Sequence, residues 1–444
     1  MSKQAAVLIG SVLITAGVTT GGFWWLSQQV PGNTIPISHG ETLVLTADRN
    51  PSKEQAAAAM AQGNYPQALA AWEASLRQNP NDPEAVIFAN NARLAGGVVP
   101  SLAVVVPATT ATTAARELLR GVAQAQQELN AGNRWAFRVA IANDENRPDL
   151  AKKVAQQLGA NPTVLGVIGH FGSEASLAAA PIYNQVGLPM ISATSTSTQL
   201  STAGPAIFRT VPSDRFTAEA LARYGLNTLR RRRALVLFNA DSSYSQSLKT
   251  EFATALAASG GQVVGEINLA DPNYRASAVP PQAQQLRADF LALLPNTATL
   301  EPALEAAIAN NQRLPMVGGD SVYNPKTLQL GGAAVRNLVV AVPWHIEKNP
   351  TARFVATSRQ LWRGDVNWRT AMAYDAVQAW HTALSSGGPP TRERLLSTLQ
   401  LPGFQAVGAT GMVQFLPSGD RNQAMQLVRV VPGNRSGFGL DFRP

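Results

Sequence analysis

Hydrophobic residues follow different spacings in different parts of this chain. Residues 5–26 are uncharged throughout, residues 51–94 are alanine-rich with helical spacing, and from residue 101 onwards short β-branched runs alternate with helical patterns. Strands that alternate with helices of about 10–15 residues are typical of parallel sheets covered by helices on both faces. We therefore expect an α/β architecture over residues 101–444.

Within that region, short apolar runs are the predicted strands. They are SLAVVVP, WAFRVAIAND, TVLGVIG, PMISA, RALVLFNAD, QVVGEINL, DFLALLP, PMVGGD and LVVAVPW. Helical patterns lie between the first of them, at about residues 114–130, 148–158 and 173–186. Because the region is too long for one sheet, we expect two doubly wound parallel-sheet lobes, with ligands bound by loops that follow the carboxyl ends of strands.

The uncharged stretch at residues 5–26 is long enough to cross a bilayer as a helix, since a helix rises about 1.5 Å per residue. Lys3 precedes it, so the positive-inside rule leaves the N-terminus in the cytoplasm and exports the rest. Two tryptophans near its end lie where interfacial aromatic residues are expected. We interpret residues 1–30 as an N-terminal transmembrane helix and residues 31–50 as a linker. A cleaved signal peptide is the main alternative, although no A-x-A site follows, and a buried core helix is another.

Residues 51–97 form a separate helical region, with turn signals at Gly63-Asn64 and at residues 79–83. The stretch GNYPQALAAWEASLRQNPNDPEA resembles a tetratricopeptide repeat (TPR). The residues that carry this resemblance are Gly63, Tyr65, Ala68, Trp72, Leu76 and Pro80. Such repeats need about three copies for independent stability, so a single unit should dock on the neighbouring domain, pair with another copy or bind a protein partner.

Composition excludes several kinds of chemistry. The 444 residues include no cysteine, which excludes disulfides, thiolate nucleophiles and a lipid-modified cysteine anchor. The four histidines are scattered singly, and we expect neither a metal site nor a cofactor. The net charge is +8, but the only dense basic run, residues 230–233, has no interleaved aromatic residue, so we expect no nucleic-acid partner.

Catalysis is also disfavoured. No G-x-x-x-x-G-K-[ST] sequence is present, which argues against an ATPase. His170 lies three residues before Ser173, but no G-x-S-x-G elbow surrounds that serine. A lone histidine at a strand end is more often a packed or capping residue than a catalytic base. We expect a protein that binds its ligand without converting it.

The loops after two predicted strands, residues 170–173 and 194–198, are rich in Gly, Ser and Thr. A helix that begins at Ser173 offers unpaired amides and the positive end of its dipole, which suit a carboxylate, and Ser173 itself can be both cap and anion ligand. Asp320, after another strand, could neutralise an ammonium group. The pattern indicates a zwitterion site, although Ser, Thr and Asp are also common at helix caps and turns.

The order of these blocks resembles that of a known family. GVIGHFGSEASLAAAPIYNQVGLPMISATSTSTQLS, followed by IFRTVPSD, is similar to the signature region of the branched-chain amino-acid (leucine, isoleucine and valine) binding proteins, which are type I periplasmic solute-binding proteins of ABC transporters. The likeness also includes IANDENRPDLAKKVAQQL, LFNADSSYSQSLKTEF, GGDSVYNP and AMAYDAVQAW. It implies two lobes joined by hinge strands, lobe 1 at about 101–213 and 340–388 and lobe 2 at about 214–339 and 389–431.

The resemblance also implies a ligand-binding site in the cleft between the lobes. Ser173 and Thr196 resemble the residues that hold the α-carboxylate of an amino acid. Tyr244 resembles a second-lobe tyrosine that closes over the ligand, and Asp320 falls where the family keeps an acid for the ammonium group. The whole implied set is Phe171, Gly172, Ser173, Thr194, Ser195, Thr196, Tyr244, Asp320 and Tyr374.

The chain departs from the family pattern near the ligand. Ala114 takes the place of an aromatic residue, Ser245 replaces a glycine and Phe171 is bulky, so we do not expect a branched-chain substrate. The resemblance implies an amino acid or similar small polar ligand, an ABC permease as partner, and a location on the periplasmic side of the bacterial inner membrane. A membrane-anchored ligand sensor or scaffold, with the helical repeat recruiting a partner, is the alternative. We expect the Gly-rich end, residues 433–444, to be a loose tail.

Overall fold

The structure is a computed structural model that describes residues 35–94, 97, 99–131 and 135–444. Residues 37–444 form one compact unit. The predicted transmembrane helix at residues 5–26 lies outside the described residues. Within the described ranges, no helix is both long and apolar enough to cross a membrane.

The first lobe is built on a six-stranded sheet, whose strands lie in the order β1-β3-β2-β4-β5-β6. All neighbours are parallel except β1, which is antiparallel to β3. The strands are β1 (Ile37–Ser38), β2 (Ser101–Val106), β3 (Arg138–Asn143), β4 (Val164–Ile168), β5 (Met190–Ser192) and β6 (Ile207–Arg209). The helices that connect them are α5 (Thr112–Asn130), α6 (Pro148–Ala160) and α7 (Ser173–Gln185).

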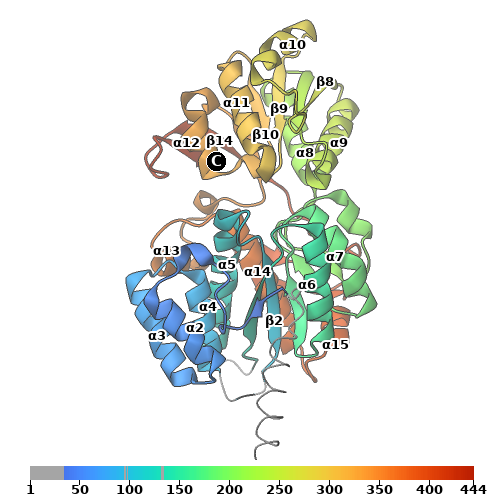
Figure 1. Cartoon of the computed structure of the whole chain (residues 1–444). Helices are drawn as coiled ribbons and strands as arrows, with labels where there is room; N and C mark the ends of the chain where they lie inside the picture. Colours follow the sequence, from blue (N-terminus) through green and yellow to red (C-terminus); the bar gives the residue numbers. More distant parts are fainter. Residues whose placement is uncertain (1–34, 95–96, 98, 132–134) are drawn as a thin grey trace, which may run out of the picture. The chain divides into compact units, whose positions relative to one another are not determined.

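The second lobe is built on a seven-stranded sheet in the order β15-β14-β11-β10-β9-β7-β8, parallel from β8 to β11 and antiparallel at β14 and β15. Figure 1 shows the two lobes one above the other. The strands are β7 (Arg233–Phe238), β8 (Gln262–Asn268), β9 (Phe290–Leu294), β10 (Met316–Gly318), β11 (Val339–Val342), β14 (Gln426–Pro432) and β15 (Leu440–Arg443). The helices are α8 (Asp214–Arg223), α9 (Ser243–Ala258), α10 (Val279–Gln285), α11 (Leu300–Asn310) and α12 (Pro325–Gly331).

After β11 the chain returns to the first lobe before it ends in the second. The returning elements are α13 (Arg353–Trp362), α14 (Trp368–Ser385), α15 (Arg392–Leu399) and the hairpin β12 (Ala406–Gly408) and β13 (Gly411–Val413). The Arg392 side chain on α15 donates to the carbonyl of Val164 in β4 at 2.9 Å. Three segments therefore cross between the lobes, at residues 210–213, 343–352 and 414–425.

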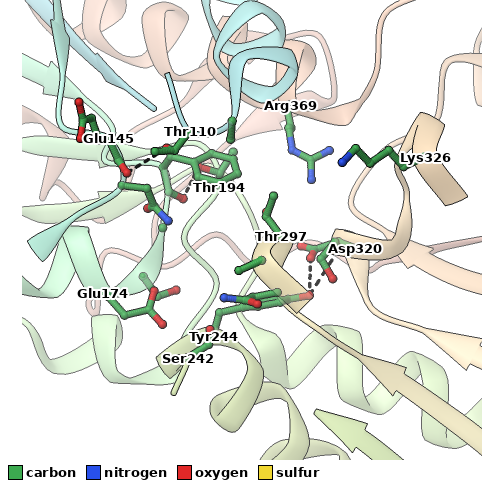
Figure 2. Close-up of a pocket in the computed structure, with 18 of the residues that line it drawn as sticks. Thr110, Glu145, Glu174, Thr194, Ser242, Tyr244, Thr297, Asp320, Lys326 and Arg369 are labelled. Carbon is green, nitrogen blue, oxygen red and sulfur yellow. Dashed lines mark hydrogen bonds between the residues drawn. The ribbon is translucent and has the colours of Figure 1, made fainter. Parts of the chain in front are cut away.

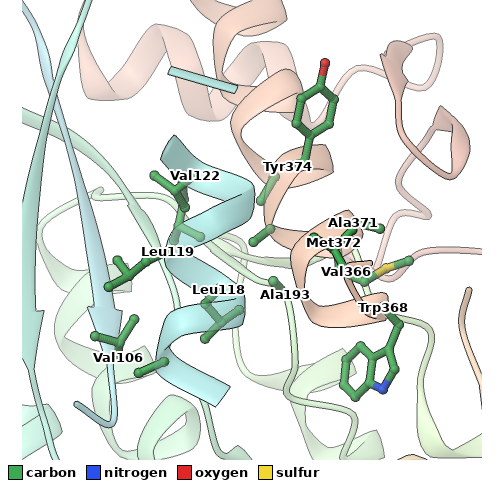
Figure 3. Close-up of a cluster of buried hydrophobic side chains, with 14 of the residues drawn as sticks. Val106, Leu118, Leu119, Val122, Ala193, Val366, Trp368, Ala371, Met372 and Tyr374 are labelled. Atoms are coloured by element: carbon green, nitrogen blue, oxygen red, sulfur yellow. The ribbon is translucent and has the colours of Figure 1, made fainter. Parts of the chain in front are cut away.

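The core of the first lobe joins α5 to α14, although more than 200 residues separate them. Leu118 and Leu119 on α5 and Met372 on α14 are almost fully buried in the cluster shown in Figure 3. Gly121 permits this close packing, because a Cβ there would overlap the carbonyl oxygen of Thr370. The Thr370 hydroxyl in turn donates to the carbonyl of Glu117 at 3.0 Å. This contact holds the beginning of α14 near the edge of the lobe.

Three helices precede the first lobe and pack on it: α2 (Pro51–Ala61), α3 (Tyr65–Gln78) and α4 (Pro83–Arg93). The helices and turns of the region at residues 51–97 are those expected. Asn91 on α4 donates to the carbonyl of Val139 at 2.8 Å and accepts from the amide of the same residue at 3.0 Å. Because Asn91 satisfies both backbone groups of a residue in β3, this helical module is docked on the lobe; its likeness to a TPR stays a prediction.

The structure differs from the sequence-based expectation at four segments. From residue 37 onwards the expected linker is part of the fold, since β1 pairs with β3 and Leu45 is fully buried. Residues 392–413, expected in lobe 2, pack on lobe 1, whereas β11 belongs to lobe 2. The expected loose tail contains β15, which pairs with β14 from Leu440 to Arg443. β1 and residues 392–413 contact partners far away in the sequence, whereas β15 pairs with the strand just before it.

Candidate functional site

The carboxyl ends of the parallel strands in the two sheets face one cavity of about 290 Å³. Loops after β2, β3, β4 and β5 form one wall, and loops after β7, β9 and β10 form the other, as expected for doubly wound sheets. Figure 2 shows the cavity. Its lining residues are Thr110, Ala111, Glu145, Asn146, Phe171, Gly172, Ser173, Glu174, Thr194, Ser242, Tyr244, Asn296, Thr297, Ala298, Asp320, Ser321, Lys326, Trp368 and Arg369.

The wall from lobe 1 contains the N-terminus of α7. The sequence suggested Ser173 as the N-cap, but the N-cap is Gly172, and no side chain caps the helix. Its first amides are therefore available to a ligand in the cavity. The Ser173 hydroxyl accepts a hydrogen bond from the amide of Ser197 at 3.2 Å. The Thr194 hydroxyl donates to the carbonyl of Phe171 at 2.8 Å, which fixes this loop beside the helix.

Asn146 is a lining residue that sequence reasoning missed. It follows β3 in a left-handed conformation, with φ of 57°. Its side-chain oxygen is buried and has no hydrogen-bond partner among the described residues. A Cβ at Gly172 would overlap that oxygen, so glycine lets the two loops approach each other. Asn146 consequently offers an unused polar group to a ligand at the entrance to α7.

The wall from lobe 2 contains a hydrogen-bonded pair. The Tyr244 hydroxyl donates to Oδ1 of Asp320 at 2.6 Å and accepts from the amide of Ser321 at 3.4 Å. Burial, together with the charge of Asp320, raises the pKa of Tyr244 well above its usual value, so the hydroxyl stays protonated. Burial also raises the pKa of Asp320, while the hydrogen bond from Tyr244 and the charge of Arg369 oppose that shift. An acid held in this way can accept from an ammonium group.

Arg369 is another lining residue that the sequence did not single out. It is the second residue of α14 and is only 7% exposed. Its guanidinium lies over the ring of Trp368, 4.3 Å from the ring centroid. Burial lowers its pKa, against the opposing charges of Asp320 and Glu117. No sequence signal marks it, because only the tertiary fold brings the beginning of α14 to the cavity.

Three predicted site residues do not line this cavity. Ser195 is buried and its hydroxyl bonds to that of Ser176 at 2.7 Å. Thr196 is fully buried. Tyr374 lies on α14 in the core shown in Figure 3, and its hydroxyl donates to Glu128 at 2.7 Å. The other six predicted residues, Phe171, Gly172, Ser173, Thr194, Tyr244 and Asp320, all line the cavity.

His170 is part of a buried hydrogen-bond network behind the wall. Its Nδ1 is 2.7 Å from a carboxylate oxygen of Asp144, and its Nε2 is 2.9 Å from the hydroxyl of Tyr183. The ring is fully buried. Both ring nitrogens are engaged, so His170 is a packed residue, as the sequence suggested. In the part of the chain that the structure describes, no group of three acidic or histidine side chains could hold a metal ion.

Comparisons with known proteins support this architecture. The family model described as periplasmic binding protein matches residues 101–437. A leucine-specific-binding protein of Salmonella typhimurium is 24% identical over 295 residues, which cover 65% of this chain and 79% of that protein. A crystal structure of a leucine binding protein from Thermotoga maritima has a TM-score of 0.68 at 22% identity and covers 78% of this chain and 98% of that one. For a solute binding protein of R. palustris in complex with benzoate, the TM-score is 0.66 at 16% identity, with coverage of 78% and 95%.

The chain belongs to the periplasmic binding protein family. Proteins of this family bind solutes outside the cytoplasm and are not enzymes. This protein is therefore a solute-binding protein with the type I fold, related to the leucine-binding proteins of ABC transporters.

Proposed function

We propose that the protein is the extracytoplasmic solute-binding protein of an ABC-type uptake system and that it binds an amino acid or similar small polar solute between its lobes. The observation that carries the proposal is the pair of unlike walls around one cavity. One wall offers the uncapped N-terminus of α7, and the other offers the buried carboxylate of Asp320. An anion fits the first and an ammonium fits the second.

The proposed pose follows from these two walls. The α-carboxylate accepts from the first amides of α7 and from the Ser173 hydroxyl. The α-ammonium donates to Asp320, which Tyr244 holds in place. The relatives' ligands are compatible with a carboxylate at α7, since leucine and benzoate, which the names of the similar proteins mention, both carry one.

Closure of the lobes would complete the site and produce the form that a membrane permease recognises. The N-terminal helix, if retained, would tether the protein to the periplasmic face of the inner membrane. A membrane-anchored sensor or scaffold is the alternative function. The docking of α4 on β3 favours a structural role for the helical module over recruitment of a partner.

Calorimetric titration of the full chain with a panel of amino acids, short amides and benzoate tests the proposal. Hydrogen bonds to charged groups contribute about 1.5–3 kcal/mol, so we expect Asp320→Asn to weaken amino-acid binding by about 10- to 100-fold. Glu305→Gln, an exposed acid on α11 of the same lobe, is the matched control and should bind as the wild type does. If no amino acid binds, or if Asp320→Asn binds unchanged, the proposed site is wrong.

A further inference from the structure

Five charged residues line the cavity, Glu145, Glu174, Asp320, Lys326 and Arg369, and two of them have opposite charges that do not neutralise each other. Arg369 and Asp320 both line it, and both are more than nine-tenths buried. In the described structure no ion pair joins them: Asp320 accepts from Tyr244, and the one hydrogen bond found for the Arg369 guanidinium is a long one, from Nη1 to the carbonyl of Tyr323 at 3.5 Å. A ligand between the lobes therefore meets both an acid and a base.

The guanidinium of Arg369 lacks adequate partners. Its Nε is buried and has no hydrogen-bond acceptor among the described residues. A buried cation is strongly unfavourable unless an anion or several acceptors compensate it. Trp368 holds the guanidinium by stacking at 4.3 Å, which fixes its plane but accepts none of its hydrogen bonds. The Arg369 guanidinium is therefore fixed in orientation and has hydrogen-bond donors available for an anionic group.

A second cation lies beside it. Lys326, on α12 of the other lobe, lines the same cavity, and Figure 2 shows its side chain and that of Arg369 pointing toward one another. Glu301 partly compensates Lys326 through a salt bridge of 2.5 Å. Two cations from opposite lobes repel each other unless an anion lies between them. An anionic ligand group at this point would therefore also favour closure of the lobes.

We infer that Arg369, assisted by Lys326, binds an anionic side chain and that the protein selects amino acids with a side-chain carboxylate, such as glutamate or aspartate. The inference rests on the proposed function, because the N-terminus of α7 takes the α-carboxylate and Asp320 takes the ammonium. The second carboxylate is then left for Arg369. The planar guanidinium can bind it with two parallel hydrogen bonds.

Glutamate and glutamine test this inference on the wild-type full chain, because they differ only in the side-chain charge. We expect calorimetry to show at least tenfold tighter binding of glutamate or of aspartate, each compared with its amide. We also expect Arg369→Gln to weaken binding of the acidic ligand at least tenfold and to change binding of its amide by less than about threefold. Arg369→Lys keeps the charge but loses the planar pair of donors. Its affinity for the acidic ligand should lie between those of the wild type and Arg369→Gln. Arg336→Gln, an exposed arginine of lobe 2, is the control.

Two results would overturn the inference. The first is equal affinity of the wild type for glutamate and glutamine and for aspartate and asparagine. The second is a uniform loss of binding for both members of a pair in Arg369→Gln, which would mean that Arg369 takes the α-carboxylate or serves only the fold. The comparison in the wild type does not depend on how well a variant folds. If leucine or another neutral amino acid binds through Asp320 while the acidic ones do not, this inference fails and the proposed function stands.

Discussion

Asp214 is a buried acid next to one of the segments that cross between the lobes. It is the first residue of α8 and is fully buried. Burial, with a smaller contribution from the charge of Asp320, raises its pKa to about 7. The hydroxyls of Thr196 and Ser247 lower it, but by less. Asp214 is therefore largely protonated in the folded protein below neutral pH.

This shift predicts how stability depends on pH. The folded state keeps the proton up to about pH 7, whereas the unfolded chain releases it near its usual value of about 3.9. Stability should therefore fall as pH rises between these two values and lose a few kcal/mol in all. We expect Asp214→Asn to be more stable than the wild type at pH 8 and to show little difference at pH 4, as measured by urea unfolding. A wild-type advantage at pH 8 would contradict this account, and Asp271→Asn, at an exposed site, is the control.

At the residue scale, the sequence predicts those site residues that lie in loops directly after strands. Ser173, Thr194 and Asp320 follow predicted strands, and the doubly wound rule brings such positions together. Arg369 could not be found in this way, because it reaches the cavity from a helix that returns to lobe 1. Thr196 is also in a loop after a strand, yet it faces the interior, since the direction of a loop side chain depends on what packs behind it.

At the element scale, the nine predicted strands are confirmed as β2 to β5 and β7 to β11. Most of them are short apolar runs that are buried on both faces, although β8 is largely half-buried. The strands that were missed include the seven-residue β14 and several shorter ones, among them β1, with two residues, and β6 and β12, with three each. Such short segments carry no period of their own. Their assignment depends on a neighbouring strand that is already in place.

The helical module contains a buried ion cluster that predicts a large effect of one substitution. Nζ of Lys53 lies 2.8 Å from Asp82 and 2.6 Å from Glu84, and all three side chains are fully buried. Glu84 also accepts from the amide of Val44 at 2.6 Å, which ties the preceding segment to α4. This cluster joins α2, α4 and the segment between β1 and α2.

We expect Lys53→Met to destabilise the protein by about 3–5 kcal/mol, because it leaves two carboxylates buried without their cation. Chemical denaturation monitored by circular dichroism measures the loss. Lys152→Met, at an exposed position on α6, should change stability by less than about 0.5 kcal/mol. Equal stability of the two variants would show that water or a rearranged side chain compensates the carboxylates. Because the module is docked on lobe 1, the loss should appear in a single transition with that lobe.

At the scale of the whole molecule, three crossings between the lobes make hinge motion the natural response to a ligand. The last crossing could not be placed from the sequence, since nothing local indicates that residues 392–413 pack on α14 and β4 before the chain returns to lobe 2. One direct bond across the cleft is the amide of Thr198 to the hydroxyl of Ser247 at 3.0 Å. The amide of Ser243 also donates to Glu174.

The absence of cysteine from the chain allows closure to be measured cleanly. Spin labels at Lys152→Cys and Ala257→Cys report the distance between α6 and α9, which belong to different lobes and are exposed at these positions. Because a ligand that bridges the two walls binds the closed form more tightly, we expect its addition to shorten the mean distance and narrow the distribution. The Ser247 hydroxyl accepts from the Thr198 amide and lies 3.4 Å from the Thr198 hydroxyl. Ser247→Ala removes these cross-cleft contacts, worth about 1 kcal/mol, so it should weaken ligand binding about fivefold and widen the distribution in the free protein. A distance that stays the same with saturating ligand would mean that the site is filled without closure, and a permease would then have to recognise the bound state by some feature other than the separation of the lobes.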